Sequence, residues 1–429
     1  MDEIIAEIVG GLTGDDSEAR QAARERLRRM TEGGELGAGH ATALVRAAVG
    51  VEPGEQEWLD PAASVLFAAR DVARRDPSPE TVAAVREVFA VLRPGARAAS
   101  LQVLTHIPTV ESARAYSELV CTYAGEFDSD GPIGFVARDY GPHFGPPAAS
   151  AEIAACIFPA VLDATGEAGL RFQMYAMLLE FFEAGLLGRE VVASHEGLFV
   201  RQLEEALGEV REHQRENVPG RLNWKYEGPY AEVRDLAALM LDLAGWWRTD
   251  AVLEAAEAFA DVHDPRLRMF RALSLLRAGR AVDPAELEWV AQSPRERYVL
   301  HKMLLGMGRV EDLPAACCDR AKLAEGNMVD WLCFGTELGR EPDEIELVAA
   351  VAVRQGRRFL RRGQLTDYYF FRFRVTEEHW SKERGWMVGM SGGFERAAGV
   401  EARPDGATFS HFCGLDEKTM DEHVADYLE

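Results

Sequence analysis

The sequence predicts a mostly α-helical fold, in which antiparallel helix pairs stack into an α-solenoid and a small α+β module follows. The first supporting observation is a repeated dipeptide: an Asp or Ser that caps a helix, then a proline at the first helical position, as in Asp264-Pro265, Asp283-Pro284 and Ser293-Pro294. The second is apolar residues spaced three or four positions apart after each dipeptide. The third is the shortness of the connections, which requires consecutive helices to lie antiparallel.

The first 127 residues are expected to be helical. Asp16 begins a helix that runs through Met30. Asp60-Pro61 and Ser78-Pro79 repeat the cap-and-proline dipeptide 18 residues apart, which is the length of one helix and a turn. Thr109 is expected to cap a further helix.

Helices are expected again from Ser150 to about Asn217, in close succession from Pro229 to Arg309, and then to about Gly339. Because the dipeptides recur at 18 to 19 residues, a helix pair spans about 36 to 40 residues, the length of HEAT and armadillo units. The region from about residue 50 to 340 therefore resembles the HEAT/armadillo-like α-solenoid repeat family. The resemblance rests on length, capping and apolar spacing, and it implies a binding scaffold rather than a catalytic activity.

Two irregular loops, residues 125–149 and 218–229, interrupt the helical pattern and are rich in aromatic side chains. Long loops within a compact array are usually functional or mobile, and exposed aromatics often anchor interfaces. The predicted partner-binding residues in these loops are Tyr140, His143, Phe144, Trp224 and Tyr226. A second interpretation is that these side chains fold back and cover the apolar face of the array itself, and the sequence does not separate the two.

The helical array is expected to span residues 1–342, and a C-terminal α+β module residues 343–429. A helix is predicted from Asp343 to about Arg354, and a terminal helix from the capping box Thr419-x-x-Glu422. The predicted strands are Asp367–Val375, Trp386–Met390 and Ala407–Phe412. The stretch from Tyr368 to Phe394 is similar to tails of actinobacterial helical-repeat proteins, and this resemblance implies no activity.

Charge and cysteine usage restrict the possible partners and the compartment. The 429-residue chain has a formal net charge of −24, which disfavours nucleic acid and anionic membranes but is compatible with a basic protein partner. The six cysteines form no C-x-x-C pair and several lie in apolar helical context, as expected of reduced thiols. The N-terminus is acidic, and no 18-residue window is uncharged and apolar throughout. We therefore expect a cytoplasmic protein.

Gly389-Met390-Ser391-Gly392-Gly393 matches the G-x-S-x-G nucleophile elbow of hydrolases and follows a predicted strand. Asp405 or Asp416 and then His411 or His423 lie downstream, in the Ser…Asp…His order that these enzymes use. The elbow requires a parallel sheet and a buried helix, however, and a segment of 87 residues cannot house that fold. A glycine-rich turn between strands is the favoured interpretation, and an esterase-like hydrolase using Ser391 is kept as an alternative.

Metal and cofactor motifs are incomplete in this sequence. Asp128-Ser129-Asp130-Gly131 begins like a calcium loop, but Pro132 and Ile133 occupy positions that need a ligand and a glycine. The spacing of His411, Cys413 and His423 fits no structural zinc site. No nucleotide-binding motif occurs. We therefore expect neither a metal nor a cofactor.

Five arginines crowd into nine residues between Arg354 and Arg362, including Arg357, Arg358 and Arg361. One interpretation is a docking patch for an acidic partner, a phosphate or nucleic acid. The other is a solvated face that offsets carboxylates such as Glu344 and Glu346.

Taken together, these patterns favour a non-enzymatic scaffold of HEAT-repeat type that binds another protein. A more specific form of this hypothesis is a bacterial immunity protein that neutralises a basic toxin, since the acidic charge would speed association. The rivals are a hydrolase using Ser391 and phosphate or nucleic-acid binding at Arg354–Arg362.

Overall fold

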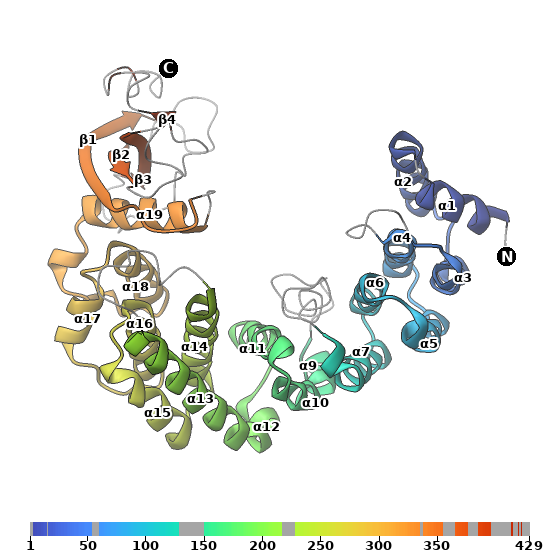
Figure 1. Cartoon of the computed structure of the whole chain (residues 1–429), viewed down its shortest axis with the longest axis horizontal. Helices are drawn as coiled ribbons and strands as arrows, with labels where there is room; N and C mark the ends of the chain where they lie inside the picture. The colour runs from blue at the N-terminus through green and yellow to red at the C-terminus, as the bar shows by residue number, and fades with distance from the viewer. Residues whose placement is uncertain are drawn as a thin grey trace. The chain divides into compact units, whose positions relative to one another are not determined.

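The computed structural model describes residues 3–14, 16–53, 60–127, 150–216, 228–334, 338–354, 365–375, 385–395, 413–414, 419 and 422 (Figure 1). Over these residues the chain is mostly helical, with a small antiparallel sheet towards the C-terminus, as the sequence predicts at this coarse level. The chain divides into two compact units, Met1–Gln202 (unit 1) and Leu203–Glu429 (unit 2), and helix α13 (Glu196–Glu216) runs through the division.

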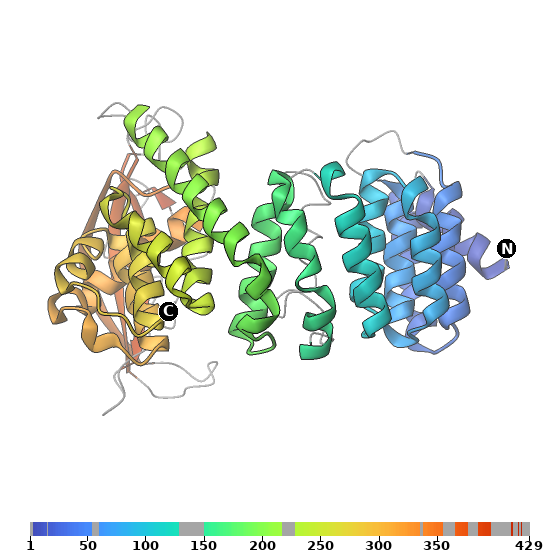
Figure 2. The ribbon, with the colours of Figure 1, turned by 90° about the horizontal axis from the view of Figure 1, so that it is seen from below.

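Unit 1 is built from helices of one to four turns. They are α1 (Glu3–Thr13), α2 (Ser17–Glu32), α3 (Ala38–Ala47), α4 (Pro61–Arg75), α5 (Pro79–Val88), α6 (Pro94–Thr105), α7 (Val110–Thr122), α9 (Ala151–Ile157), α10 (Ala160–Asp163), α11 (Ala168–Glu183) and α12 (Arg189–Val192). From α3 to α7 they form two layers, since α3, α5 and α7 pack in succession on one side and α4 packs on α6 on the other. Figure 2 shows these helices lying side by side.

The predicted helix starts of unit 1 are confirmed. The carboxylates of Asp16 and Asp60 accept hydrogen bonds from backbone amides in the first turns of α2 and α4. The hydroxyls of Ser78 and Thr109 do the same for α5 and α7. Each cap satisfies amides that have no partner within the helix, so these four starts could be predicted from local sequence.

The helices of unit 2 after α13 are α14 (Gly228–Trp247), α15 (Asp250–Glu257), α16 (Pro265–Arg277), α17 (Pro284–Val290), α18 (Pro294–Gly306) and α19 (Arg320–Phe334). Helices α14, α16, α18 and α19 pack in succession as one layer, whereas α15 and α17 lie against the side of α16. The predicted caps Asp264 and Asp283 are confirmed by their hydrogen bonds to first-turn amides. Ser293 and Thr249 precede α18 and α15, but neither side chain caps the backbone.

The sheet has the order β1-β2-β3-β4, with neighbouring strands antiparallel. Its strands are β1 (Glu344–Arg354), β2 (Leu365–Arg374), β3 (Met387–Glu395) and the two-residue β4 (Cys413–Gly414). The predicted strands at 367–375 and 386–390 are confirmed as β2 and β3, while the predicted strand 407–412 lies outside the described residues. Of the predicted terminal helix, the capping box is present: Thr419 and Glu422 each donate a backbone amide to the other's side chain.

The helix predicted from Asp343 to Arg354 is wrong, because this segment is strand β1. Its alanines favour a helix locally, yet its partner strand β2 is rich in buried aromatics and pairs with it along its length. Two cross-strand ion pairs add to this pairing, Glu344 with Arg374 and Glu346 with Arg372. Long-range pairing therefore overrides the local preference.

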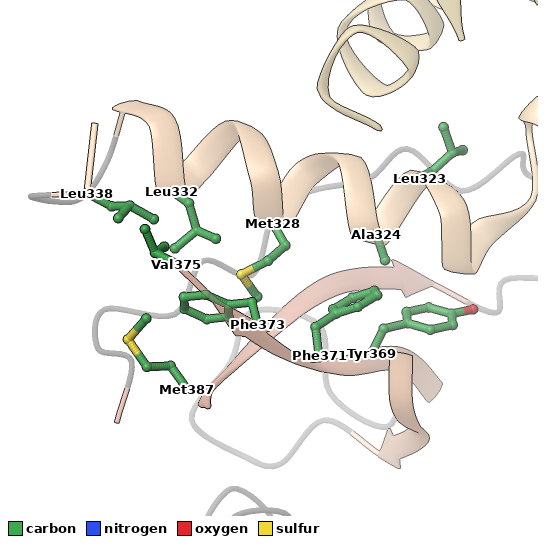
Figure 3. Packing of buried hydrophobic residues seen from close by; sticks show 10 residues of the cluster. All are labelled: Leu323, Ala324, Met328, Leu332, Leu338, Tyr369, Phe371, Phe373, Val375 and Met387. Atoms are coloured by element: carbon green, nitrogen blue, oxygen red, sulfur yellow. The ribbon is translucent and has the colours of Figure 1, made fainter. Parts of the chain in front are cut away.

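Helix α19 covers one face of the sheet (Figure 3). Met328 and Leu332 of α19 meet Phe371 and Phe373 of β2 in a buried apolar cluster. Gly389 of β3 lies beside this contact, and a Cβ there would lie 2.8 Å from the terminal methyl of Met328, so that flexible side chain would have to shift. The sheet thus belongs to the same compact unit as α14–α19.

Candidate functional site

The predicted partner-binding residues cannot be placed. Tyr140, His143 and Phe144 of the first loop, Trp224 and Tyr226 of the second, and the arginines at 357, 358 and 361 all lie outside the described residues. The calcium-like segment at 128–139 and the histidines at 411 and 423 also lie outside them. These expectations stay predictions, and the described residues have to supply any candidate site.

Ser391 lies inside strand β3, paired with Tyr369, and is 3% exposed. The glycine-rich turn predicted at 389–393 is therefore wrong, because the whole segment is strand. The Ser391 hydroxyl accepts a hydrogen bond of 3.0 Å from the side-chain amide of Asn327 on α19. A nucleophile elbow instead presents an exposed hydroxyl on a sharp strand-to-helix turn. This geometry gives the hydrolase hypothesis no support at Ser391.

A second serine takes part in a Ser-His-Asp chain on the surface of unit 1. Ser194 Oγ lies 3.1 Å from His195 Nδ1, and His195 Nε2 lies 2.9 Å from Asp163 Oδ1. In a catalytic triad the ring nitrogens have the opposite roles, and the serine faces a substrate site. Asp163 is 77% exposed here, so the pair with His195 is a surface bridge between α10 and the turn before α13.

Metal-ligating side chains do not gather among the described residues. No group of three or more His, Cys, Asp or Glu side chains in these ranges could hold a metal ion. Of the three residues considered for zinc, only Cys413 is described, in the short strand β4.

The described residues do bring together a set of arginines, carboxylates and aromatics on the α14–α16–α18–α19 layer of unit 2. We call it the arginine strip, and its members are Arg234, Asp235, Arg266, Phe270, Arg295, Glu296, Asp330 and Phe334. Four helices that are consecutive in one layer each contribute two residues, so the strip crosses the layer.

One carboxylate serves two guanidinium groups in the strip. Asp235 Oδ1 lies 3.4 Å from Arg234 Nη2 and 3.5 Å from Arg266 Nε, both longer than a well-formed ion-pair hydrogen bond. The Nε atom of Arg266 is buried and has no hydrogen-bond partner among the described residues. A buried donor left unsatisfied carries a desolvation cost of about 1–3 kcal/mol.

Burial lowers the pKa of Arg266, and the guanidinium groups of Arg295 and Arg234 act in the same direction, while Asp235 and Glu296 oppose them. Arginine stays charged at neutral pH even so. Arg266 is therefore a partly desolvated cation with two like charges near it, an arrangement that favours the approach of an anionic or hydrogen-bond-accepting group.

Arg295 is more completely paired and supports an exposed aromatic ring. Its Nε donates to Asp330 at 3.1 Å and its Nη1 to Glu296 at 3.3 Å. Burial disfavours its charged form, but Glu296, Cys333 and Asp330 together raise its pKa. Its guanidinium stacks on the ring of Phe334 at 4.4 Å, and Phe334 is 64% exposed. The strip thus ends in an apolar ring held in place by a fixed charge.

The sequence carries one signal of the arginine strip. Arg266 and Arg295 each follow directly after a cap-and-proline dipeptide, in Asp264-Pro265-Arg266 and Ser293-Pro294-Arg295. Because α16 and α18 are neighbours in the same layer, the same position in both helices falls on the same side. Their convergence with Arg234 depends on packing and could not be predicted from spacing.

No described helix combines the length and the apolar content that a membrane span requires. Neither protein-family models, curated proteins nor solved structures gave a match to this chain. The function has to be inferred from the geometry of the chain itself.

Proposed function

We propose that this protein is a non-enzymatic scaffold of HEAT-repeat type that binds another protein, with the arginine strip as one contact surface. The layering within each unit supports the proposal. In unit 1, α3, α5 and α7 pack in succession opposite α4 and α6, and in unit 2 α14, α16 and α18 do so with α15 and α17 at their side. Alternating helices in two layers are the arrangement of a helical repeat array, whose surface is its working part.

The observation that carries the proposal is the exposed ring of Phe334, which stacks on the buried Arg295, beside the partly desolvated Arg266. Aromatic and arginine side chains are the residue types that contribute most to protein interfaces. An apolar ring with 64% of its surface exposed gains from burial by a partner.

The net charge of −24 favours a partner that is basic overall, because long-range attraction raises the association rate. An immunity protein that neutralises a basic toxin is one specific form of this proposal. In that case the charge would act on the rate of encounter, and the strip on the lifetime of the complex.

The test uses the full chain as bait in an extract of its native cells, followed by titration of each captured protein in purified form by calorimetry. The variant Phe334→Ala with Arg266→Gln removes the exposed ring and the desolvated charge. Its matched control, Val91→Ala with Arg114→Gln, makes the same kinds of change at exposed positions of unit 1. Thermal unfolding establishes that all three proteins are folded.

We expect the strip variant to weaken the purified complex by about tenfold or more, as for the loss of one interface hot spot. The control variant should bind like the wild type. Equal binding by the wild type and the strip variant would remove the strip from the interface. Turnover of a captured small molecule or protein would contradict a purely binding role.

A further inference from the structure

A separate groove lies in unit 1 and is lined by residues of α1, α2 and α4. These three helices pack against one another (Figure 1). It has a volume of about 800 Å³. Leu12 of α1, Leu27 of α2 and Ala68 of α4 line it and are themselves buried, so its floor is apolar. Phe67 of α4 also lines it and is 38% exposed, so part of its surface is open to solvent.

The rim of this groove is positive in a chain that is strongly negative. Five arginines line it against three carboxylates, so positive charges are in excess around the groove. The arginines are Arg24 and Arg28 from α2 and Arg70, Arg74 and Arg75 from α4. The carboxylates are Glu25, Glu32 and Asp71. The two helices thus present cations from both sides of an apolar floor.

The carboxylates lie close to particular arginines. Glu25 pairs with Arg28 at 2.6 Å, and Asp71 pairs with Arg70 at 2.8 Å. The third carboxylate, Glu32, lies 3.8 Å from Arg28. Arg75 donates to the backbone carbonyl of Thr31 at 2.6 Å and so ties α4 to the end of α2.

Arg24 and Arg74 are different, because neither has an ion pair or a side-chain hydrogen bond within the described part of the chain. Both are exposed and both line the groove, one on α2 and one on α4. The arginines of α4 also act on a nearby histidine. Burial lowers the pKa of His106, and the charges of Arg70 and Arg74 lower it further. The groove therefore offers two available guanidinium groups across an apolar floor.

We propose that the α2/α4 groove binds an acidic segment of a partner protein, one that places an aliphatic or aromatic side chain on the floor and carboxylates against Arg24 and Arg74. Guanidinium groups bind carboxylates through paired, charge-assisted hydrogen bonds. Burial of a hydrocarbon side chain on the apolar floor is favourable. A bare phosphate or a sugar-phosphate backbone has no such side chain. This site is distinct from the arginine strip, and the inference does not depend on the function proposed for that strip.

The charge of the rest of the chain does not prevent this binding. At physiological ionic strength the Debye length is about 8 Å, so a segment inside the groove responds mainly to the arginines around it. A long nucleic acid would extend beyond the groove and meet the repulsion of a chain with a net charge of −24. The observations therefore favour a short acidic peptide segment over a nucleic acid.

The test measures binding of the full chain to a pooled library of fluorescein-labelled peptides. In these peptides Glu or Asp recurs every three or four positions, and Leu, Ile or Phe recurs at the same spacing between them. A second library replaces every acid by its amide, and a single-stranded oligonucleotide is the third probe. The groove variant is Arg24→Glu with Arg74→Glu. Its matched control is Arg29→Glu with Arg114→Glu, which reverses the same charge at exposed positions outside the groove.

We expect the acidic library to contain peptides that bind saturably, and the amide library to contain none of comparable affinity. The groove variant should weaken binding by about tenfold or more, more strongly at low salt, while the control variant changes it little. No enrichment of acidic peptides, equal binding of the amides, or equal losses in the two variants would overturn the proposal. Tighter binding of the oligonucleotide, lost in the groove variant, would overturn the peptide assignment in favour of a nucleic acid.

Discussion

The hydroxyl of Tyr230 donates a hydrogen bond of 2.7 Å to Asp264 Oδ2, while Oδ1 of the same carboxylate accepts from the first-turn amides of α16. Both residues are almost fully buried, at 2% and 1% exposed. One carboxylate thus caps a helix and fixes its neighbour α14, which carries Tyr230. The contact links a cap that the sequence predicts to a packing partner 34 residues earlier.

This relationship predicts the effect of Tyr230→Phe. The substitution leaves one buried carboxylate oxygen without its donor, so the free energy of unfolding should fall by about 2 kcal/mol, as for hydrogen bonds to charged groups. Urea unfolding measures it. Asp264→Ala should cost more, because it also removes the cap. A Tyr230→Phe protein as stable as the wild type would show that the hydroxyl contributes nothing.

The same pair predicts a pH dependence above the ordinary range. Burial and the nearby Asp264 raise the pKa of Tyr230 well above its ordinary value of 10.0. The folded state therefore holds the proton that the unfolded state releases near pH 10, and the stabilisation is full below that pH and lost as pH rises above it. Between pH 9 and pH 11 the free energy of unfolding of the wild type, measured in urea, should fall by more than that of Tyr230→Phe. Parallel curves for the two proteins would contradict this.

Gly326 allows α19 to approach α18 closely. A Cβ at this position would lie 2.6 Å from the Cβ of Tyr298 and would collide with the backbone carbonyl of Pro294. Gly326→Ala should therefore lower the free energy of unfolding by about 1–3 kcal/mol, the usual cost of overpacking. Gly208→Ala in α13 is the matched control, because nothing lies near its Cβ position; it should stabilise by about 0.5–1 kcal/mol. Equal effects of the two substitutions, measured by thermal unfolding, would show that the helices can separate at no cost.

Ser391→Ala separates a structural role from the catalytic alternative. The substitution leaves the buried amide of Asn327 without the hydroxyl that accepts its hydrogen bond, so we expect a loss of about 1–2 kcal/mol in stability. Hydrolysis of a generic ester, if the protein shows any, should be unchanged. Loss of such activity in a variant that remains folded would revive the hydrolase hypothesis.

Local signals predicted much of the fold, and non-local ones decided the rest. Asp16, Asp60, Ser78 and Thr109 were predictable as caps, because a cap satisfies amides only two or three residues away. Strand β1 was not predictable, because its alanine-rich sequence becomes a strand only through pairing with β2.

The candidate sites depend even more on packing. Arg234, Arg266 and Arg295 are about thirty residues apart from one to the next, and only the succession of α14, α16 and α18 brings them together. The α2/α4 groove likewise joins Arg24 to Arg74 across 50 residues. A sequence pattern reveals arginines that are close together in the chain, as at 354–362. It does not reveal arginines that only the packing of helices brings together.

The thiol of Cys333 on α19 should react at different rates in the folded and the unfolded chain. Burial raises its pKa to about 12, and Arg295 opposes this shift without overcoming it. Because the thiolate is the reactive form, iodoacetamide at pH 8 should modify Cys333 in the folded protein far more slowly than in urea. Peptide mass spectrometry after timed alkylation measures both rates. Fast modification of Cys333 in the folded protein would mean that α19 separates locally from α18, which carries Arg295.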